Sequence, residues 1–199
     1  MKKLILVTSP PACGKTYVSK EMAKALDHVV YLDKDTLITL SKQIFVVANQ
    51  EYNRSSDFFE EHIRDYEYDA ILDLAMEALD YDDTVLINAP FTREVRDEKF
   101  VKNLEAQLAE KGAKLVVIWV VTDKEVCHQR MIERASDRDT WKLEHWDEYI
   151  AGCNFEIPTV FDNSENSELL IFNNSSTEEF NESITRIVDA IQDKEPALV

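Results

Sequence analysis

The fold of this chain is decided by the stretch Leu4–Thr16, which reads LILVTSPPACGKT. Its first four residues, Leu4–Val7, are all apolar, and its last three, Gly-Lys-Thr, stand just before a segment with helical periodicity, Val18–Leu26. A short apolar run without polar alternation is typical of a strand that is buried on both faces of a parallel sheet. We therefore predict a buried strand, a tight loop and a helix, in that order.

The loop resembles the P-loop, or Walker A motif, G-x-x-x-x-G-K-[ST], with Ser9 in place of the first glycine. In that motif, backbone N–H groups at a helix N-terminus converge on phosphate oxygens, and a glycine, here Gly14, allows the tight path. The resemblance implies that Lys15 reaches the β- and γ-phosphates of ATP and that the Thr16 hydroxyl ligates Mg²⁺. The residues expected to surround the nucleotide are Pro11, Ala12, Cys13, Gly14, Lys15, Thr16 and Tyr17. The alternative is an ordinary strand–turn–helix with a surface lysine.

Cys13 lies near the predicted N-terminus of this helix, whose positive end favours a thiolate, so we expect its thiol pKa to be lowered. Its side chain is interpreted as a small group beneath a bound phosphate rather than as a redox switch. The chain has three cysteines, and an odd number at wide spacing predicts neither a disulfide framework nor a zinc site. Free thiols are typical of a reducing compartment, so we expect a cytoplasmic protein.

The remainder of the chain repeats the alternation of strand and helix. Further apolar runs occur at Val29–Leu32, Val85–Ile87, Leu115–Val121 and Leu169–Phe172, and helical periodicity covers Ile71–Leu79, Val101–Leu108, Val126–Ile132 and Phe180–Ile191. This pattern predicts an α/β fold, a three-layer α/β/α sandwich with a five-stranded parallel sheet. A length of 199 residues suits one domain, residues 1–199.

Two carboxylates, Asp33 and Asp35, follow the predicted second strand. Ligands of parallel sheets bind beyond the carboxyl ends of the strands, and residues two apart in extended backbone point to the same side. One carboxylate is then placed to hold Mg²⁺ through water, while the other accepts a proton from an attacking hydroxyl. The alternative is that Asp35 or Thr36 caps the next helix and that Asp33 is a solvated loop residue.

The phosphate loop, the Asp-x-Asp pair and an arginine-rich segment after the fourth strand together resemble the small P-loop kinases. These include shikimate and gluconate kinases, chloramphenicol phosphotransferase, zeta-toxin-type kinases and polynucleotide kinase. The resemblance implies an ATP-dependent phosphotransferase that moves the γ-phosphoryl group to a hydroxyl of a small molecule. It implies Asp33 on the metal side and Asp35 as the acceptor-side base, an acceptor-binding helical insert at about 36–79 and a lid at about 130–150.

Two departures from these kinases narrow the prediction. Asn88 stands where many P-loop proteins carry a Walker B carboxylate, and an amide is a weaker ligand on the metal side, which leaves more of the metal duty to Asp33. The Gly-Gly-x-x-Arg of shikimate kinases is missing after the third strand, where Phe91–Arg96 stands instead. We therefore do not expect shikimate as the substrate.

Arg130, Arg134 and Arg138 recur every four residues, so they share one face if the helix persists. The resemblance implies a lid in which Arg130 and Arg134 stabilise the transferring phosphoryl group, with Arg130 also contacting the nucleotide. The alternative is a solvated helix face with local pairs, such as Arg134 with Asp137 and Arg130 with Glu133.

Three further residues are expected around the ligands. Loops after the fifth strand contact adenine in these kinases, which implies a nucleotide contact for Asn174; a polar cap before the last helix is the alternative. Arg54, in the insert, and Arg93, after the third strand, are expected to bind an anionic or polar acceptor. A surface salt bridge is an equally good interpretation of either arginine. The aromatic residues Phe45, Phe58 and Phe59 are expected in the core of the insert.

The chain is strongly acidic, with 22 Lys and Arg against 39 Asp and Glu and a net charge of −17. A field of this sign repels phosphate backbones and anionic lipids, so we expect neither long nucleic acids nor membranes as partners. We expect a small-molecule acceptor as the partner, and a monomer or a homodimer. Two other functions stay open: a kinase for nucleotides or nucleic-acid ends, and an ATP-binding switch or ATPase without a small-molecule acceptor.

Overall fold

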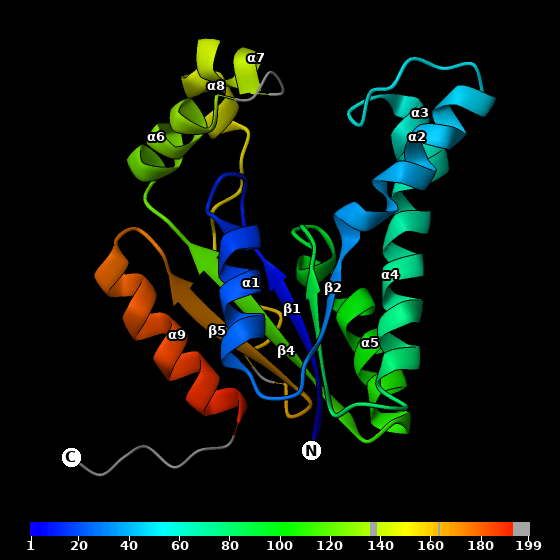
Figure 1. Ribbon diagram of the computed structural model, residues 1–199, viewed down its shortest axis with the longest axis vertical. Helices are drawn as coiled ribbons and strands as arrows, with labels where there is room; N and C mark the ends of the chain where they lie inside the picture. Colours follow the sequence, from blue (N-terminus) through cyan, green and yellow to red (C-terminus); the bar gives the residue numbers. More distant parts are fainter. Residues whose placement is uncertain (136–138, 163, 193–199) are drawn as a thin grey trace.

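The computed structural model describes residues 1–135, 139–162 and 164–192. Within them lies one sheet of five parallel strands in the order β2-β3-β1-β4-β5 (Figure 1). The strands are β1 (Lys2–Thr8), β2 (Val30–Asp33), β3 (Thr84–Asn88), β4 (Ala113–Val121) and β5 (Ser167–Asn173). The five predicted strands are confirmed, and none of their ends differs by more than two residues from the prediction.

Helices cover both faces of this sheet. They are α1 (Lys15–Ala25), α2 (Ile38–Val47), α3 (Asp57–Phe59), α4 (Asp65–Ala78), α5 (Glu98–Glu110), α6 (Lys124–Arg134), α7 (Thr140–Glu144), α8 (Trp146–Ala151) and α9 (Thr177–Ile191), with the 3₁₀ turns η1 (Lys34–Leu37) and η3 (Glu94–Arg96) and the π-helical turn η2 (Glu60–Arg64). Side chains of α4 and α5 pack into one core and side chains of α1 and α9 into another. The predicted three-layer sandwich is therefore confirmed.

Strand β1 explains why the sheet has two cores. Its residues Leu4–Val7 are all fully buried, because β3 and β4 pair with it on either side and helices cover it above and below. Successive side chains of a strand point to opposite faces. Accordingly, Leu4 and Leu6 belong to the core beneath α4 and α5, whereas Ile5 and Val7 belong to the core beneath α1 and α9.

The long segment between β2 and β3 holds more than one helix, as expected. After η1 and α2, the elements α3, η2 and α4 follow one another without a break and carry the chain back towards β3 (Figure 1). A small core of Phe45, Phe59 and Ile63, with Phe58 packed against it, holds the outer end together. The three predicted core aromatics of the insert are therefore confirmed.

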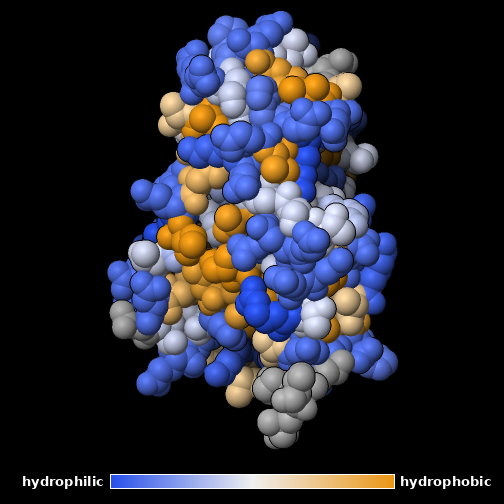
Figure 2. Space-filling model, turned by 90° about the vertical axis from the view of Figure 1, so that its left-hand side faces the viewer, coloured by the Kyte–Doolittle hydropathy of each residue, from blue (hydrophilic) through white to orange (hydrophobic). Residues whose placement is uncertain are grey.

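Figure 2 shows mostly hydrophilic residues, with apolar areas between them, on the face that carries α6 and α9. In the part of the chain that the structure describes, no helix combines the length and the apolar character needed to cross a membrane.

The core on the α4–α5 face is expected to supply most of the stability of that layer. Leu108 is fully buried in α5, whereas Leu74 of α4 is 46% exposed. Leu108→Ala is expected to lower the free energy of unfolding by about 2–5 kcal/mol, because it removes buried methyl groups and leaves a cavity. The matched control Leu74→Ala is expected to change it by about 0.5 kcal/mol or less. Urea denaturation followed by circular dichroism measures both, and equal losses would contradict this assignment of the core.

Candidate functional site

The loop between β1 and α1, residues 9–14, has an unusual backbone. Ala12 and Gly14 both adopt left-handed conformations, with φ values of 65° and 83°. A Cβ atom added at Gly14 would lie 2.6 Å from Nδ2 of Asn174, so both the backbone angle and the space require glycine there. Ser9 has no positive φ, and its hydroxyl donates to the carbonyl of Pro10 at 2.7 Å. This explains why a serine is tolerated where the motif has its first glycine.

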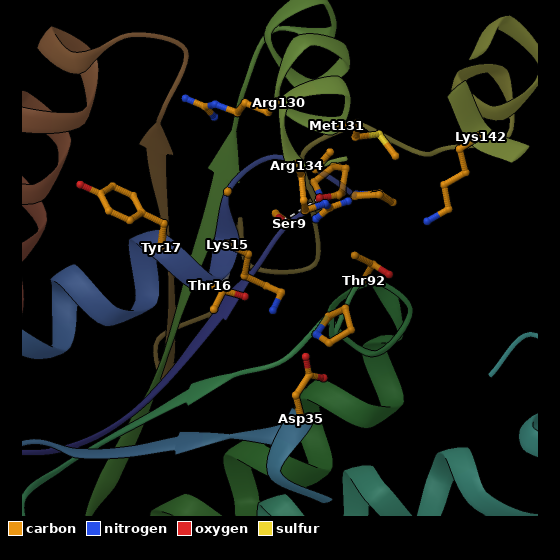
Figure 3. A pocket seen from close by; sticks show the side chains of 15 residues that line it. Ser9, Lys15, Thr16, Tyr17, Asp35, Thr92, Arg130, Met131, Arg134 and Lys142 are labelled. Atoms are coloured by element: carbon orange, nitrogen blue, oxygen red, sulfur yellow. Dashed lines mark hydrogen bonds between the residues drawn. The ribbon is translucent and has the colours of Figure 1, made fainter. Parts of the chain in front are cut away.

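A cavity of about 490 Å³ opens over this loop at the carboxyl edge of the sheet. It is lined by Ser9, Pro10, Pro11, Ala12, Gly14, Lys15, Thr16, Tyr17, Asp35, Pro90, Thr92, Arg130, Met131, Arg134 and Lys142. Figure 3 shows Lys15 and Thr16 at the start of α1, Asp35 across the cavity on η1, and Met131 and Arg134 on α6. The structure therefore brings together residues that lie in four separate regions of the sequence. We call this the central cavity.

Asn88, the last residue of β3, connects several side chains beneath this cavity by hydrogen bonds. Its Oδ1 accepts a 2.6 Å hydrogen bond from Nζ of Lys15, and its Nδ2 donates to Oδ2 of Asp33 at 2.9 Å. The Ser19 hydroxyl also donates to Oδ1, and Nδ2 lies 3.5 Å from Oγ1 of Thr16. The sequence marked Asn88 as a missing carboxylate and not as a site residue. Its place at the end of a predicted neighbouring strand was the signal that could have found it.

The surroundings of Lys15 make its protonated form less stable than in water. Burial lowers the pKa of Lys15 to about 8, although the carboxylates of Asp35 and Asp33 act in the opposite direction. The lysine is thus mostly protonated at neutral pH and loses its charge as the pH rises through 8.

The two aspartates at the end of β2 and the start of η1 have different surroundings. Asp33 caps η1, since its Oδ1 accepts from the backbone N–H of Asp35 at 3.0 Å, and the Tyr31 hydroxyl donates to its Oδ2 at 3.0 Å. The alternative in which Asp35 or Thr36 is the cap and Asp33 a solvated loop residue is therefore wrong. The side chain of Asp35 is exposed and lines the central cavity.

The helix that carries the arginines extends beyond the predicted range Val126–Ile132 at both ends, and it includes Arg130 and Arg134. Helix α6 ends at Arg134, because Ala135 turns to a left-handed φ of 45°, and Arg138 and Asp137 lie outside the described residues. Nε of Arg134 donates to Oδ2 of Asp139 at 2.9 Å, and the guanidinium still lines the central cavity.

Arg130 is held in place on one side only. Its Nη2 donates to the carbonyl of Asn174 at 2.8 Å, while its buried Nη1 has no hydrogen-bond partner among the described residues. The pair with Glu133, which the alternative of a solvated helix face included, is not formed through this guanidinium; Glu133 instead accepts a hydrogen bond from Gln129. An unpaired buried donor beside the phosphate loop is suited to a negatively charged oxygen.

A second cavity of about 440 Å³ adjoins the first beside α9. Gly14, Tyr17 and Arg130 line both cavities, and the rings of Tyr17 and Phe180 lie 5.2 Å apart at this one. Asn174 also lines it, while its Nδ2 donates to the carbonyl of Cys13 at 2.7 Å. The aromatic wall suits a planar base, and the predicted contact of Asn174 with adenine stays a prediction.

The predicted cap before α9 is present in the same loop. The hydroxyl of Ser176 accepts from the N–H of Glu179 at 3.1 Å, and the Glu179 carboxylate accepts from the N–H of Ser175 at 2.8 Å.

The expectation for Cys13 is corrected by the structure. Its Sγ lies 3.7 Å from Sγ of Cys127 on α6, and both thiols are fully buried and free. The hydrogen bond with Cys127 and burial raise the pKa of the Cys13 thiol, which outweighs the helix N-terminus. The sulfur atom lies under the loop and points towards α6.

Arg54 and Arg93 each form a salt bridge and also line a cavity, so they agree with both interpretations, a salt bridge and an acceptor-binding role. Arg54 makes a two-pronged contact with the Glu67 carboxylate, at 2.7 and 2.6 Å, and Arg93 makes one with Glu60, at 2.7 and 3.2 Å. Both arginines nevertheless line a third cavity, of about 230 Å³.

Oxygen atoms suited to Mg²⁺ lie beside the phosphate loop, on Thr16 and Asp33. The described residues contain no group of three His, Cys, Asp or Glu side chains that could hold a metal by themselves. Mg²⁺ prefers oxygen ligands and keeps several waters and substrate phosphates in its shell. Thr16 and Asp33 are the residues that would hold it, together with the phosphates.

The titration of Lys15 provides a test of the site. Because its pKa is lowered in the folded state, the unfolded state binds more protons between pH 8 and the ordinary value of about 10.4, so the contribution of Lys15 to the free energy of unfolding rises with pH in that window. Asn88→Asp, which places a carboxylate against the ammonium, is expected to raise the pKa of Lys15 towards the ordinary value. Carbon NMR of the lysine ε-methylenes, with Lys15→Arg to assign the signal, measures both values. A Lys15 signal that titrates near pH 10 in the unchanged protein would contradict the burial argument.

Residues 4–155 match the family described as the AAA domain. Among solved structures the chain is similar to a presumed kinase from Chloroflexus aurantiacus J-10-fl, with 19% identity, a TM-score of 0.63, and coverage of 98% of this chain and 99% of that chain. It is also similar to a sugar kinase from Janibacter sp. HTCC2649, with 11% identity, a TM-score of 0.54, and coverage of 94% and 95%. A third similar structure is Chaetomium thermophilum Kti12 in complex with ADP-AlF3, with 18% identity, a TM-score of 0.51, and coverage of 94% and 98%. The comparison with curated proteins finds no match.

At these identities the solved structures show the fold, and they agree with the resemblance to P-loop kinases found in the sequence. The family match runs from β1 to the segment after α8 and includes the phosphate loop, Asp33, Asn88 and both lid arginines. Since this match covers well over half of the chain, the protein belongs to the AAA domain family of P-loop proteins.

Proposed function

We propose that this protein is an ATP- and Mg²⁺-dependent phosphotransferase that moves the γ-phosphoryl group to a hydroxyl of a small molecule. One observation carries the proposal: the central cavity has the phosphate loop, with Lys15 and Thr16, on one side and the exposed carboxylate of Asp35 on the other. A nucleotide switch needs the first feature only. A kinase needs both, because an acceptor hydroxyl must be held in line with the phosphoryl group.

The phosphate loop would bind the polyphosphate of ATP. Left-handed residues Ala12 and Gly14 turn the backbone towards the N-terminus of α1, where N–H groups have no partners within the helix. The Lys15 ammonium stands at the entrance to this helix and supplies the local positive charge. Mg²⁺ bound with the nucleotide would neutralise charge on the β- and γ-phosphates, with Thr16 and, through water, Asp33 holding it.

Asp35 would orient the acceptor hydroxyl and accept its proton. Its side chain is exposed, so it is free to meet a substrate, and no described hydrogen bond engages its carboxylate. Asp33, in contrast, already accepts hydrogen bonds from Tyr31, Asn88 and the Asp35 backbone. The Asp33 carboxylate is therefore held by hydrogen bonds beneath the cavity, whereas the Asp35 carboxylate lies in the cavity without such bonds.

The lid arginines would neutralise the charge that spreads over the transferring group. Arg130 offers its unpaired Nη1 between the first and second cavities, and Arg134 offers a guanidinium inside the first one. Closure of α6–α8 over the nucleotide would also exclude water and limit hydrolysis.

Similar proteins support a kinase and leave the acceptor open. The sugar kinase favours a small-molecule acceptor, and the complex of Kti12 with ADP-AlF3 favours nucleotide binding at this loop. The second candidate function is a nucleotide-dependent switch, which is favoured by an amide, Asn88, in place of the usual carboxylate. The net charge of −17 disfavours long nucleic acids but not a mononucleotide acceptor.

The first test measures ADP release with a panel of sugars, nucleosides, antibiotics and hydroxy acids. A kinase is expected to release ADP faster with its acceptor, whereas a switch turns over slowly whatever is added. Asp35→Asn is expected to lower acceptor-dependent turnover by roughly 100- to 10,000-fold, the usual contribution of a positioned base. The matched control Asp73→Asn, at an exposed position on α4, is expected to keep it. Unchanged phosphorylation in Asp35→Asn would remove Asp35 from its assigned role.

The second test concerns the phosphate loop. Lys15→Ala removes a charge-assisted contact and is expected to weaken ATP binding by roughly 10- to 100-fold. Lys20→Ala changes an exposed lysine of the same helix and is the control. Calorimetric titration with Mg²⁺ and a non-hydrolysable ATP analogue measures both affinities. Equal affinities would mean that nucleotide binding does not use this loop.

A further inference from the structure

The third cavity has an unexpected composition for so acidic a chain. It is lined by four basic side chains together with two aromatic rings, a proline and a threonine: Lys34, Arg54, Arg64, Arg93, Phe59, Tyr68, Pro90 and Thr92. No carboxylate is among these lining residues, although the chain has 39 acids against 22 bases. We call this cavity of about 230 Å³ the four-cation pocket.

Acidic residues hold these cations from outside the lining. Glu67 contacts both Lys34 and Arg54, while Glu60 contacts Arg93. Arg64 contacts Asp65 and Glu94. Four bases and four acids balance in number, but only the basic groups face the pocket. Each arginine keeps further N–H donors after its acid is satisfied, since a guanidinium has more donors than one carboxylate can take.

Glu67 is the anchor on the inner side. Burial alone would favour its neutral form, but hydrogen bonds from Arg54, Lys34 and Ser41 more than offset burial and lower the pKa of Glu67 to about 2. It therefore stays ionised and fixes both bases at once. The Lys34 side chain is only 4% exposed, which shows how deeply this end of the pocket is built.

Aromatic rings restrict two of the three arginines further. The guanidinium of Arg54 lies 4.4 Å from the ring centre of Phe59, and that of Arg64 lies 4.4 Å from the ring centre of Tyr68. Groups held by an acid on one side and by a ring on another lose little freedom when a ligand binds. The pocket is thus preorganised for a negatively charged group.

The four-cation pocket adjoins the central cavity. Pro90 and Thr92 line both, and the consecutive residues Lys34 and Asp35 line one each. A ligand with its charged end in the four-cation pocket would therefore extend towards Asp35 and the phosphate loop. Because Lys34 and Asp35 are consecutive residues of η1, the charged end of the ligand and its reacting hydroxyl would lie close together, which suits a small molecule.

We propose that the four-cation pocket binds an oxyanion group of the phosphoryl acceptor, so that the acceptor is a small hydroxylated anion. The shared chemistry of a carboxylate and a phosphate ester, two or more negative oxygens in a fixed geometry, matches the arginine forks. This inference rests on the proposed function, and it extends the expectation for Arg54 and Arg93 to Lys34 and Arg64.

The test uses minimal anions while the phosphate loop is filled. The full chain is saturated with Mg²⁺ and β,γ-imido-ATP at constant ionic strength and then titrated with acetate, orthophosphate or acetamide, with binding followed by ligand-observed NMR. At least one anion is expected to bind, and acetamide, the uncharged analogue of acetate, is expected to bind at least about tenfold more weakly than that anion. Binding of acetate alone assigns a carboxylate acceptor, binding of orthophosphate alone a phosphate ester, and both results support the inference.

Arg93→Gln is the variant of choice, because the Arg93 side chain is 67% exposed and its replacement leaves the buried network intact. It is expected to weaken anion binding about tenfold. Arg186→Gln, the same change on α9 outside the three cavities, is expected to leave it unchanged.

Binding of the nucleotide analogue distinguishes failure of the proposed function from failure of this inference alone. If the imido-ATP does not bind, the proposed function fails and the inference fails with it. If it binds but neither anion exceeds acetamide, or Arg93→Gln has no effect, only the inference is overturned.

Discussion

The hydrogen bonds of Asn88 are the interaction on which the rest of the site depends. An amide offers an acceptor and a donor at once, so Asn88 satisfies the Lys15 ammonium with one atom and the Asp33 carboxylate with the other. A carboxylate at this position would accept from the lysine but would repel Asp33 at such a distance. The register of the sheet already pairs Asp33 with Asn88, so an amide at this position fits the neighbouring carboxylate. The Asp33 carboxylate and the Lys15 ammonium are linked through one neutral residue.

The order of the strands explains why so many chemical groups meet here. With β1 between β3 and β4, and β2 beside β3, the segments that follow all four strands reach the same edge of the sheet. The phosphate loop follows β1, Asp33 ends β2 and Asp35 follows it, and helix α6 with its arginines begins after β4. Figure 1 shows α6–α8 on one side of this edge and α2 and α3 on the other. The proposed nucleotide and acceptor regions would thus be separated in space by the same topology that separates them in sequence.

Much of this arrangement could be predicted from the sequence, because its signals are local. The run Leu4–Val7 and the Gly-Lys-Thr that ends the loop contain the strand, the turn and the helix in one window. Lys34 shows the limit: it stands between two aspartates and resembles a surface residue, yet it is buried because Glu67, far along the chain, provides its partner. The same holds for Cys13, whose neighbour Cys127 is brought near by β4 pairing with β1. Local patterns also do not specify that α6 ends at Arg134, since a left-handed Ala135 has no strong sequence signal.

The contact between Cys13 and Cys127 has a consequence for how the lid can move. Cys127 sits in the first turn of α6, buried against the phosphate loop, and Arg130, one turn later, is fastened to the carbonyl of Asn174. A swing of the whole helix would have to open both contacts at once. Closure of the proposed lid would therefore be easiest by bending beyond Arg130. The end of α6, with α7 and α8, would then move relative to the phosphate loop. In such a movement Arg130 would keep its place beside the phosphate loop, whereas Arg134, which already lines the central cavity, would change its position together with the end of α6.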